Sequence, residues 1–136
     1  PRFRSTEGEY VDNAGREDLL KSGMILGPFF MFRKSLLEKT KVFDEQLVSG
    51  ADFDLAIRFA YNGKGMHIPH NSGYYLNEGL GASTRPDSKQ PLERTVIEMR
   101  YGLEVLQPEL MGAASEYDIE RIHNGSFKFK SKCLVV

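Results

Sequence analysis

The segment DFDLAIRFAYNG, residues 52–63, constrains the fold of this chain more than any other. Its apolar side chains cover most of a helical surface rather than one stripe, which is typical of a helix buried on several sides. Gly63 suits the position after a helix, where a left-handed backbone is common. The segment therefore predicts a buried helix that the rest of the chain must surround.

Two carboxylates, Asp52 and Asp54, open this helix and face the positive end of its dipole. Residues two apart point in different directions, so we expect the two to have different roles. Asp54 stands four residues before Arg58 and is expected to pair with it. Asp52 follows the flexible Ser49-Gly50 without such a partner, so it fits either a general base or an N-terminal helix cap.

The remaining pattern predicts both strands and helices. Strands are expected at 24–32, 64–69, 73–76 and, by alternation, 126–136. Further helices are expected at 16–21, 35–39 with Ser35 as cap, 90–106 and 115–122, the third being amphipathic through Leu92, Val96, Met99, Leu103 and Leu106. A long loop at 77–88 is expected to be functional or mobile. This order of elements predicts a mixed α/β or α+β fold.

Size and charge narrow the classes of function. With 136 residues the chain has the length of one domain, and 18 basic against 19 acidic residues give a net charge of −1, which favours neither nucleic acid nor an anionic bilayer as partner. No apolar run reaches the length of a membrane span. The single Cys133 fits a reducing compartment, hence the cytoplasm. Because the chain begins at Pro1 in a polar stretch, we expect a fragment of a longer protein.

Residues 27–83 carry several short motifs in a defined order. A Gly27 strand leads to Arg33-Lys34, and a Phe43-Asp44-Glu45 turn precedes the acidic helix start. A Tyr-containing strand and a Gly- and Ser-containing loop, residues 75–83, follow. In this order and spacing the segment resembles the C-terminal half of family 2 glycosyltransferases with the GT-A fold. That half binds the acceptor and carries the catalytic base.

The resemblance implies a fold, a domain division and a set of roles. Residues 1–106 would form the acceptor-side half of a GT-A mixed sheet with flanking helices, and 107–136 a helix-and-strand extension. Asp52 would be the catalytic base, although Ala51 stands where the family often has Glu or Gly. The acceptor-binding residues would be Gly27, Pro28, Phe29 and Asp54. The donor and loop residues would be Arg33, Asn77, Glu78 and Ser83, with Arg33 alternatively holding structure through Asp44 or Glu45.

The implied reaction transfers a sugar, with inversion, from a nucleotide-sugar donor to a hydroxyl of a saccharide, lipid or protein acceptor. A divalent cation, Mg²⁺ or Mn²⁺, would neutralise the leaving diphosphate, held mainly by the missing half of the domain. No metal ligand is expected in this chain, since a histidine that some relatives have in the loop is absent. The enzyme would be cytoplasmic or peripheral to the membrane. The alternatives are a non-catalytic carbohydrate- or protein-binding module, and a structural domain in which Asp52 is merely a cap.

Overall fold

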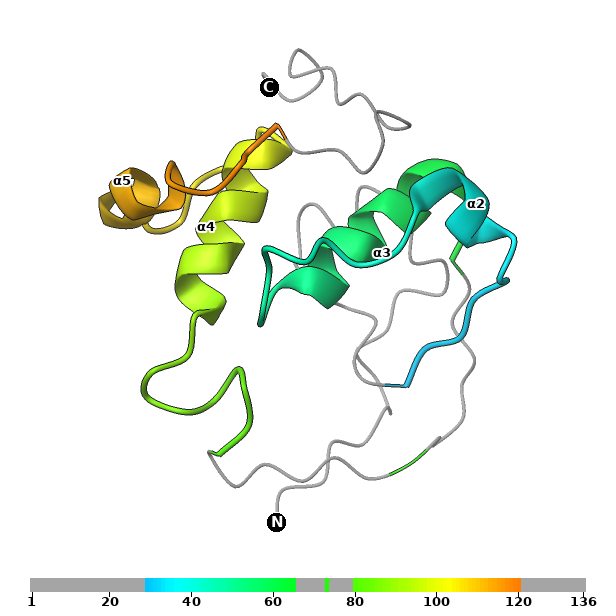
Figure 1. Cartoon of the computed structure of the whole chain (residues 1–136), viewed down its shortest axis with the longest axis horizontal. Helices are drawn as coiled ribbons and strands as arrows, with labels where there is room; N and C mark the ends of the chain where they lie inside the picture. Colours follow the sequence, from blue (N-terminus) through cyan, green and yellow to red (C-terminus); the bar gives the residue numbers. More distant parts are fainter. Residues whose placement is uncertain (1–28, 66–72, 74–79, 121–136) are drawn as a thin grey trace.

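The computed structural model describes residues 29–65, residue 73 and residues 80–120. These residues form helices joined by turns and loops (Figure 1). In chain order the elements are α2 (Leu36–Thr40), α3 (Ala51–Asn62), α4 (Gln90–Arg100), the short 3-10 helix η1 (Pro108–Leu110) and α5 (Met111–Ala114).

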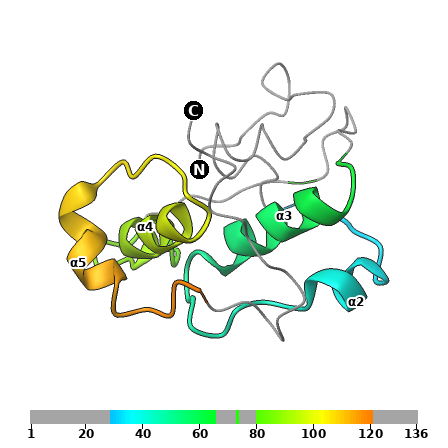
Figure 2. The same ribbon diagram turned by 90° about the horizontal axis from the view of Figure 1, so that it is seen from above.

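The helices lie across the molecule in the order α5, α4, α3, α2, as both ribbon views show (Figures 1 and 2). The apolar core forms where α3 and α4 meet, from Phe53 and Ile57 of α3 and Val96 and Ile97 of α4. Ala114 of α5 is fully buried in the same cluster. The core is thus shared by three helices, and no single helix could bury its apolar surface alone.

The expected mixed α/β sheet of the GT-A type is wrong for the described residues, because they contain helices and no strand. Residues 29–32, the described end of the first expected strand, have no regular structure, and neither do residues 64–65 and Gly73. The remaining residues of the four expected strands lie outside the described residues, as does the helix expected at 16–21. An apolar run interrupted by Gly and Pro looks alike in a strand and in an irregular segment, which is why the pattern misled.

Helix α3 confirms the expected buried helix. All residues from Phe53 to Phe59 are buried, including two charged ones. The helix ends at Asn62, whose side-chain amide donates to the Arg58 carbonyl at 2.9 Å. Gly63 is extended, with φ −157°, and not left-handed as expected.

The short helix expected after Ser35 is confirmed as α2, although the Ser35 side chain makes no capping hydrogen bond. Ser35 contributes through its backbone carbonyl instead, which accepts a hydrogen bond from the Glu38 N–H at 3.2 Å. Lys41 follows the helix with a positive φ of 60°, and its N–H donates to Leu37 O at 2.8 Å. A backbone turn therefore ends α2 directly before the loop that leads to α3.

Helix α4 is shorter than expected because Gly102 ends it. Gly102 has φ 62°, and its N–H donates to Met99 O at 3.3 Å while Leu103 N–H donates to Glu98 O at 2.8 Å. This pair of bonds is the Schellman arrangement that commonly closes helices. The expected helix 90–106 is thus confirmed for its first three turns and wrong after Arg100.

The C-terminal helix also differs from the expectation. The helix predicted at 115–122 is wrong over 115–120, which form turns, and residues 121–122 lie outside the described residues. Helix α5 lies earlier, at Met111–Ala114, after the turn that Pro108 starts. Proline suits the first turn of a helix because its missing N–H is not needed there.

Candidate functional site

A buried glutamate of α4 fixes the start of α3. Glu93 is 0% exposed, and its carboxylate accepts hydrogen bonds from three consecutive backbone amides of the loop before α3. The N–H groups of Val48, Ser49 and Gly50 lie 2.9, 2.6 and 2.7 Å from its oxygens. Successive amides that converge in this way form an anion-binding concavity. Here the protein's own carboxylate occupies it.

Gly50 allows this close approach. A Cβ at that position would lie 3.2 Å from Glu93 Cβ and 3.1 Å from Ile97 Cδ1. Both contacts are tighter than most Cβ contacts in proteins, so a larger residue would require the Glu93 and Ile97 side chains to shift by a few tenths of an ångström. The flexible Gly50 noted in the sequence therefore serves to pack the loop closely against α4.

A cleft of about 570 Å³ lies in front of this junction. Its walls come from the loop before α3, the first residues of α3, the loop at 82–83 and one face of α4. Ser49 Oγ lies 3.4 Å from the Ala82 carbonyl, which connects two of the walls. The lining residues are Phe43, Leu47, Val48, Ser49, Gly50, Ala51, Asp52, Phe53, Ala82, Ser83, Gln90, Arg94 and Ile97.

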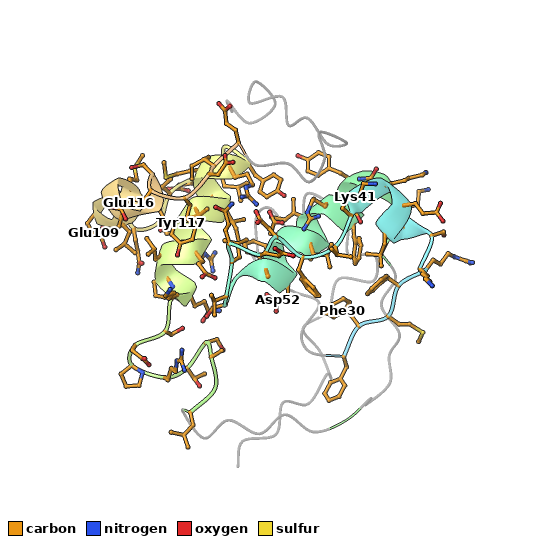
Figure 3. All side chains as sticks on the ribbon, viewed as in Figure 1. Phe30, Lys41, Asp52, Glu109, Glu116 and Tyr117 are labelled. Carbon is orange, nitrogen blue, oxygen red and sulfur yellow. The ribbon has the colours of Figure 1, made fainter. Side chains whose placement is uncertain are left out.

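Asp52 lines the cleft and is exposed. It is the second residue of α3, and Figure 3 shows it at the end of the helix nearest α4. Asp52 is not the N-cap residue of the helix, because that position belongs to Gly50. Asp52 Oδ1 instead accepts from the neighbouring Phe53 N–H at 2.8 Å. Its carboxylate therefore lines the cleft and also accepts one amide of the first turn of α3.

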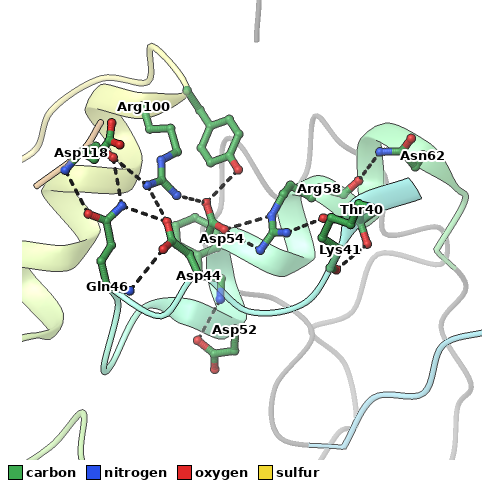
Figure 4. Close-up of polar contacts among 12 residues, drawn as sticks. Thr40, Lys41, Asp44, Gln46, Asp52, Asp54, Arg58, Asn62, Arg100 and Asp118 are labelled. Carbon is green, nitrogen blue, oxygen red and sulfur yellow. Dashed lines mark hydrogen bonds and ion pairs between the residues drawn. The ribbon is translucent and has the colours of Figure 1, made fainter. Parts of the chain in front are cut away.

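Asp54 points the opposite way, into a buried polar cluster (Figure 4). The expected pair with Arg58 is confirmed, with Arg58 Nε and Nη2 at 3.0 and 2.8 Å from Asp54 Oδ2. Asp54 Oδ1 accepts from Arg100 Nη1 at 2.7 Å and from the Tyr101 hydroxyl at 2.8 Å. Because Asp54 is 1% exposed, these partners hold its charge inside the fold. The expectation that Asp52 and Asp54 differ in role agrees with this geometry.

Arg100 joins Asp54 to a second buried carboxylate. Its Nη2 donates to Asp44 Oδ2 at 2.8 Å and to the Asp118 carbonyl at 3.1 Å, and its Nε donates to the Ile119 carbonyl at 3.2 Å. The Gln46 amide group donates to Asp44 Oδ2 and to the Asp118 carbonyl, both at 2.9 Å. One guanidinium thus ties α4 to α3, to the loop before α3 and to the segment after α5.

The pKa shifts of Asp44 and Tyr101 favour the protonation states that form these hydrogen bonds. Burial by itself would raise the pKa of Asp44, but hydrogen bonds from the side chain and amide of Gln46 and from Arg100 outweigh it and lower the pKa below the usual 3.8. Burial and the neighbouring Asp54 raise the pKa of Tyr101 well above the usual 10.0, so its hydroxyl stays a donor.

The variant Asp44→Asn is expected to be less stable than the natural chain near neutral pH and to lose this deficit in acid. With a folded pKa below 3.8, the Asp44 contribution is fully present above the unfolded value and disappears as pH falls through the folded value. Urea unfolding at about pH 7 and at several values below pH 4 should show the two free energies of unfolding converging. A difference that stays constant with pH would contradict the bonded carboxylate.

Of the predicted site residues, the structure brings Asp52 and Ser83 together on the cleft and leaves others elsewhere. Phe29 and Arg33 are exposed and do not line the cleft. Asp54, for which the resemblance implied acceptor binding, does not line it either, because it is 1% exposed and bonded inside the fold. Asp44, one expected partner of Arg33, instead binds Arg100. The other predicted residues, Gly27, Pro28, Asn77 and Glu78, lie outside the described residues.

The predicted apolar face of the 90–106 segment is confirmed in part. Val96 lies in the core, Leu92, Met99 and Leu103 pack against it, and Leu106 is 60% exposed. The pattern missed two buried residues of α4, Glu93 and Ile97, and Tyr101 directly after the helix. Their recurrence at intervals of four is the signal that could have found them. Glu93 is the residue that positions the loop before α3.

Within the described residues, no group of three His, Cys, Asp or Glu side chains could hold a metal ion. We therefore assign none of these residues as a ligand of a divalent cation and derive no step through one. No helix in the same part of the chain is long and apolar enough to cross a lipid bilayer. Comparison with protein families, with characterised proteins and with solved structures gave no match to this chain.

Proposed function

We propose that this chain takes part in glycosyl transfer as the part that binds the acceptor, with Asp52 as general base. The proposal starts from the order of motifs in residues 27–83 that resembles family 2 glycosyltransferases. The observation that carries it is the position of Asp52, exposed in a cleft at the start of α3. Glu93 holds the loop before this helix, and Asp52 contributes one hydrogen bond, from the Phe53 N–H, to its first turn.

The chemistry needs one carboxylate on the acceptor side. The acceptor hydroxyl gives its proton to Asp52 while its oxygen forms a bond to the anomeric carbon of the donor. The bond between that carbon and the nucleoside diphosphate breaks on the opposite face, which inverts the configuration. A correctly placed base contributes about 10²–10⁴-fold to such a step.

The other partners follow from the same resemblance. The donor is a nucleotide sugar, and the acceptor is a molecule with a free hydroxyl. A divalent cation, Mg²⁺ or Mn²⁺, would balance the charge of the leaving diphosphate, and we assign it no residue of this chain. We place the reaction in the cytoplasm, since the single Cys133 suits a reducing compartment.

Asp52→Asn in the protein that carries this chain is expected to lower sugar transfer by at least about 10²-fold, because asparagine has the same shape but cannot take up the proton. Binding of the nucleotide sugar should persist, since Asp52 acts on the acceptor. Release of nucleoside diphosphate in the presence of acceptor measures transfer, and calorimetry measures donor binding.

The matched control is Asp118→Asn, an exposed aspartate outside the cleft, which should transfer sugar at the natural rate. Unchanged turnover in Asp52→Asn would end the proposal. Binding of a carbohydrate without turnover in the natural protein would support the non-catalytic module instead.

A further inference from the structure

We infer that the cleft takes a neutral saccharide, which would make the acceptor a sugar rather than a lipid or a protein. That the bound sugar is the acceptor rests on the proposed function. The binding of a sugar to the cleft can be measured without turnover. It follows from the volume of the cleft, its balance of charges and the mixture of side chains on its walls.

The cleft is lined by one acidic and one basic side chain, so their charges cancel. Asp52 and Arg94 are the charged residues among those that line it in the described part of the chain. Arg94 Nε donates to Glu98 Oε1 at 2.9 Å, and Glu93 lies behind the loop that forms one wall. A phosphate or carboxylate ligand would therefore meet the Asp52 carboxylate and an Arg94 whose charge is already balanced in part by Glu98. A neutral ligand avoids that repulsion.

The uncharged groups suit a molecule rich in hydroxyls. Ser49, Ser83 and Gln90 add donors and acceptors to those of Asp52 and Arg94. The contact with Glu98, which is 4% exposed, orients the Arg94 guanidinium. Its terminal nitrogens bond to no other described residue, which leaves them available to ligand oxygens. An acyl chain in this cleft would displace water from these five polar side chains and offer no hydrogen bonds in return, which disfavours a lipid.

The rim supplies an aromatic surface. Phe43 lines the cleft with 49% of its surface exposed, beside Val48 at 62%. A sugar ring carries C–H groups on its faces and hydroxyls at its edge, and the electron-rich face of phenylalanine attracts such C–H groups. A peptide would more commonly add to a strand edge or lay a helix in a long groove. The described residues contain no strand, and about 570 Å³ is the size of a small-molecule pocket.

Saturation-transfer NMR on the 136-residue chain tests the inference with four kinds of probe. These are a panel of neutral disaccharides (cellobiose, maltose, lactose and chitobiose), inorganic phosphate, phosphatidylcholine vesicles and a serine-containing tetrapeptide. At least one disaccharide should bind, and competition within the panel gives its dissociation constant. Preference for phosphate, vesicles or peptide over every disaccharide would overturn the inference, and so would the absence of all binding.

Two variants locate the sugar. Phe43→Ala and Arg94→Gln should each raise the dissociation constant about fivefold, the size of a lost stacking contact or charged hydrogen bond. The controls are Met111→Ala, an exposed apolar residue outside the cleft, and Arg85→Gln. Arg85 pairs with Asp87 and is 47% exposed, against 44% for Arg94, so it matches in chemistry and exposure.

The outcomes separate this inference from the proposed reaction. Sugar binding that weakens in Phe43→Ala and Arg94→Gln supports the inference even if Asp52→Asn leaves turnover unchanged. Sugar binding that is indifferent to both variants would overturn it, because the sugar would then lie elsewhere. Circular dichroism of each variant confirms that the helices are retained.

Discussion

Replacing Arg100 with methionine is expected to lower the free energy of unfolding by about 3–5 kcal/mol, the usual cost of removing one partner from a buried ionic group. Arg100 bonds Asp54 and Asp44, whose side chains are 1% and 0% exposed. Methionine would fill much of the space but would remove one charged partner from each of the two carboxylates. Asp54 would keep Arg58 and Tyr101, so the larger loss falls on Asp44.

Urea unfolding of the natural chain and of Arg100→Met measures this difference directly. Arg85→Met is the control, because Arg85 forms an exposed pair with Asp87 that contributes little. If Arg100→Met does not fold, Arg100→Lys should fold with reduced stability, since one ammonium group cannot reach both carboxylates in the fork geometry of arginine. Equal effects at Arg100 and Arg85 would mean that the buried cluster does not hold α4 to α3.

Local features of the fold were predictable from sequence. Helix α3 follows from an apolar pattern within one segment, and the Asp54–Arg58 pair follows from a spacing of four. Both depend on residues within one helix. The division of roles between Asp52 and Asp54 follows from helix geometry in the same way. Such predictions succeed because the physics that decides them acts over one or two turns.

Long-range partners were not predictable. Asp44 and Arg100 are 56 positions apart, and Gly50 and Glu93 are 43 apart. Nothing in one sequence indicates which of many charged residues will meet across the core. The burial of Glu93 has the same origin. This charged residue is stable next to the core because a distant loop supplies its donors, which apolar periodicity cannot indicate.

The prediction of a sheet was wrong for a different reason. Short apolar runs next to Gly and Pro fit a strand, a buried turn or an irregular segment equally well by pattern, and strand pairing needs a partner that the run itself does not specify. The four segments expected as strands contribute no strand to the described residues. The cleft therefore rests on helix packing and on the loop held by Glu93.

Glu93→Ala is expected to lower the free energy of unfolding by about 2–4 kcal/mol. The change leaves the amides of Val48, Ser49 and Gly50 without their acceptor at the edge of the core, and a half-buried donor without a partner costs about 1–3 kcal/mol. Water entering the space left by the side chain would recover part of this loss. Glu93→Gln keeps one acceptor oxygen but points an amide N–H group at the same donors, so it should fall between alanine and the natural residue.

Amide hydrogen exchange gives the decisive measurement for Glu93, because it observes the three donors individually. In Glu93→Ala the amides of residues 48–50 should exchange much faster, whereas the Asp54 amide, bonded to the Gly50 carbonyl at 3.1 Å, should change less. Glu109→Ala, an exposed glutamate outside the core, should leave stability and exchange unaltered. Uniform acceleration across α3 in Glu93→Ala would mean that the glutamate supports the whole fold. Selective acceleration would identify it as the residue that fixes the loop before Asp52, and thereby the cleft wall on which the proposed base stands.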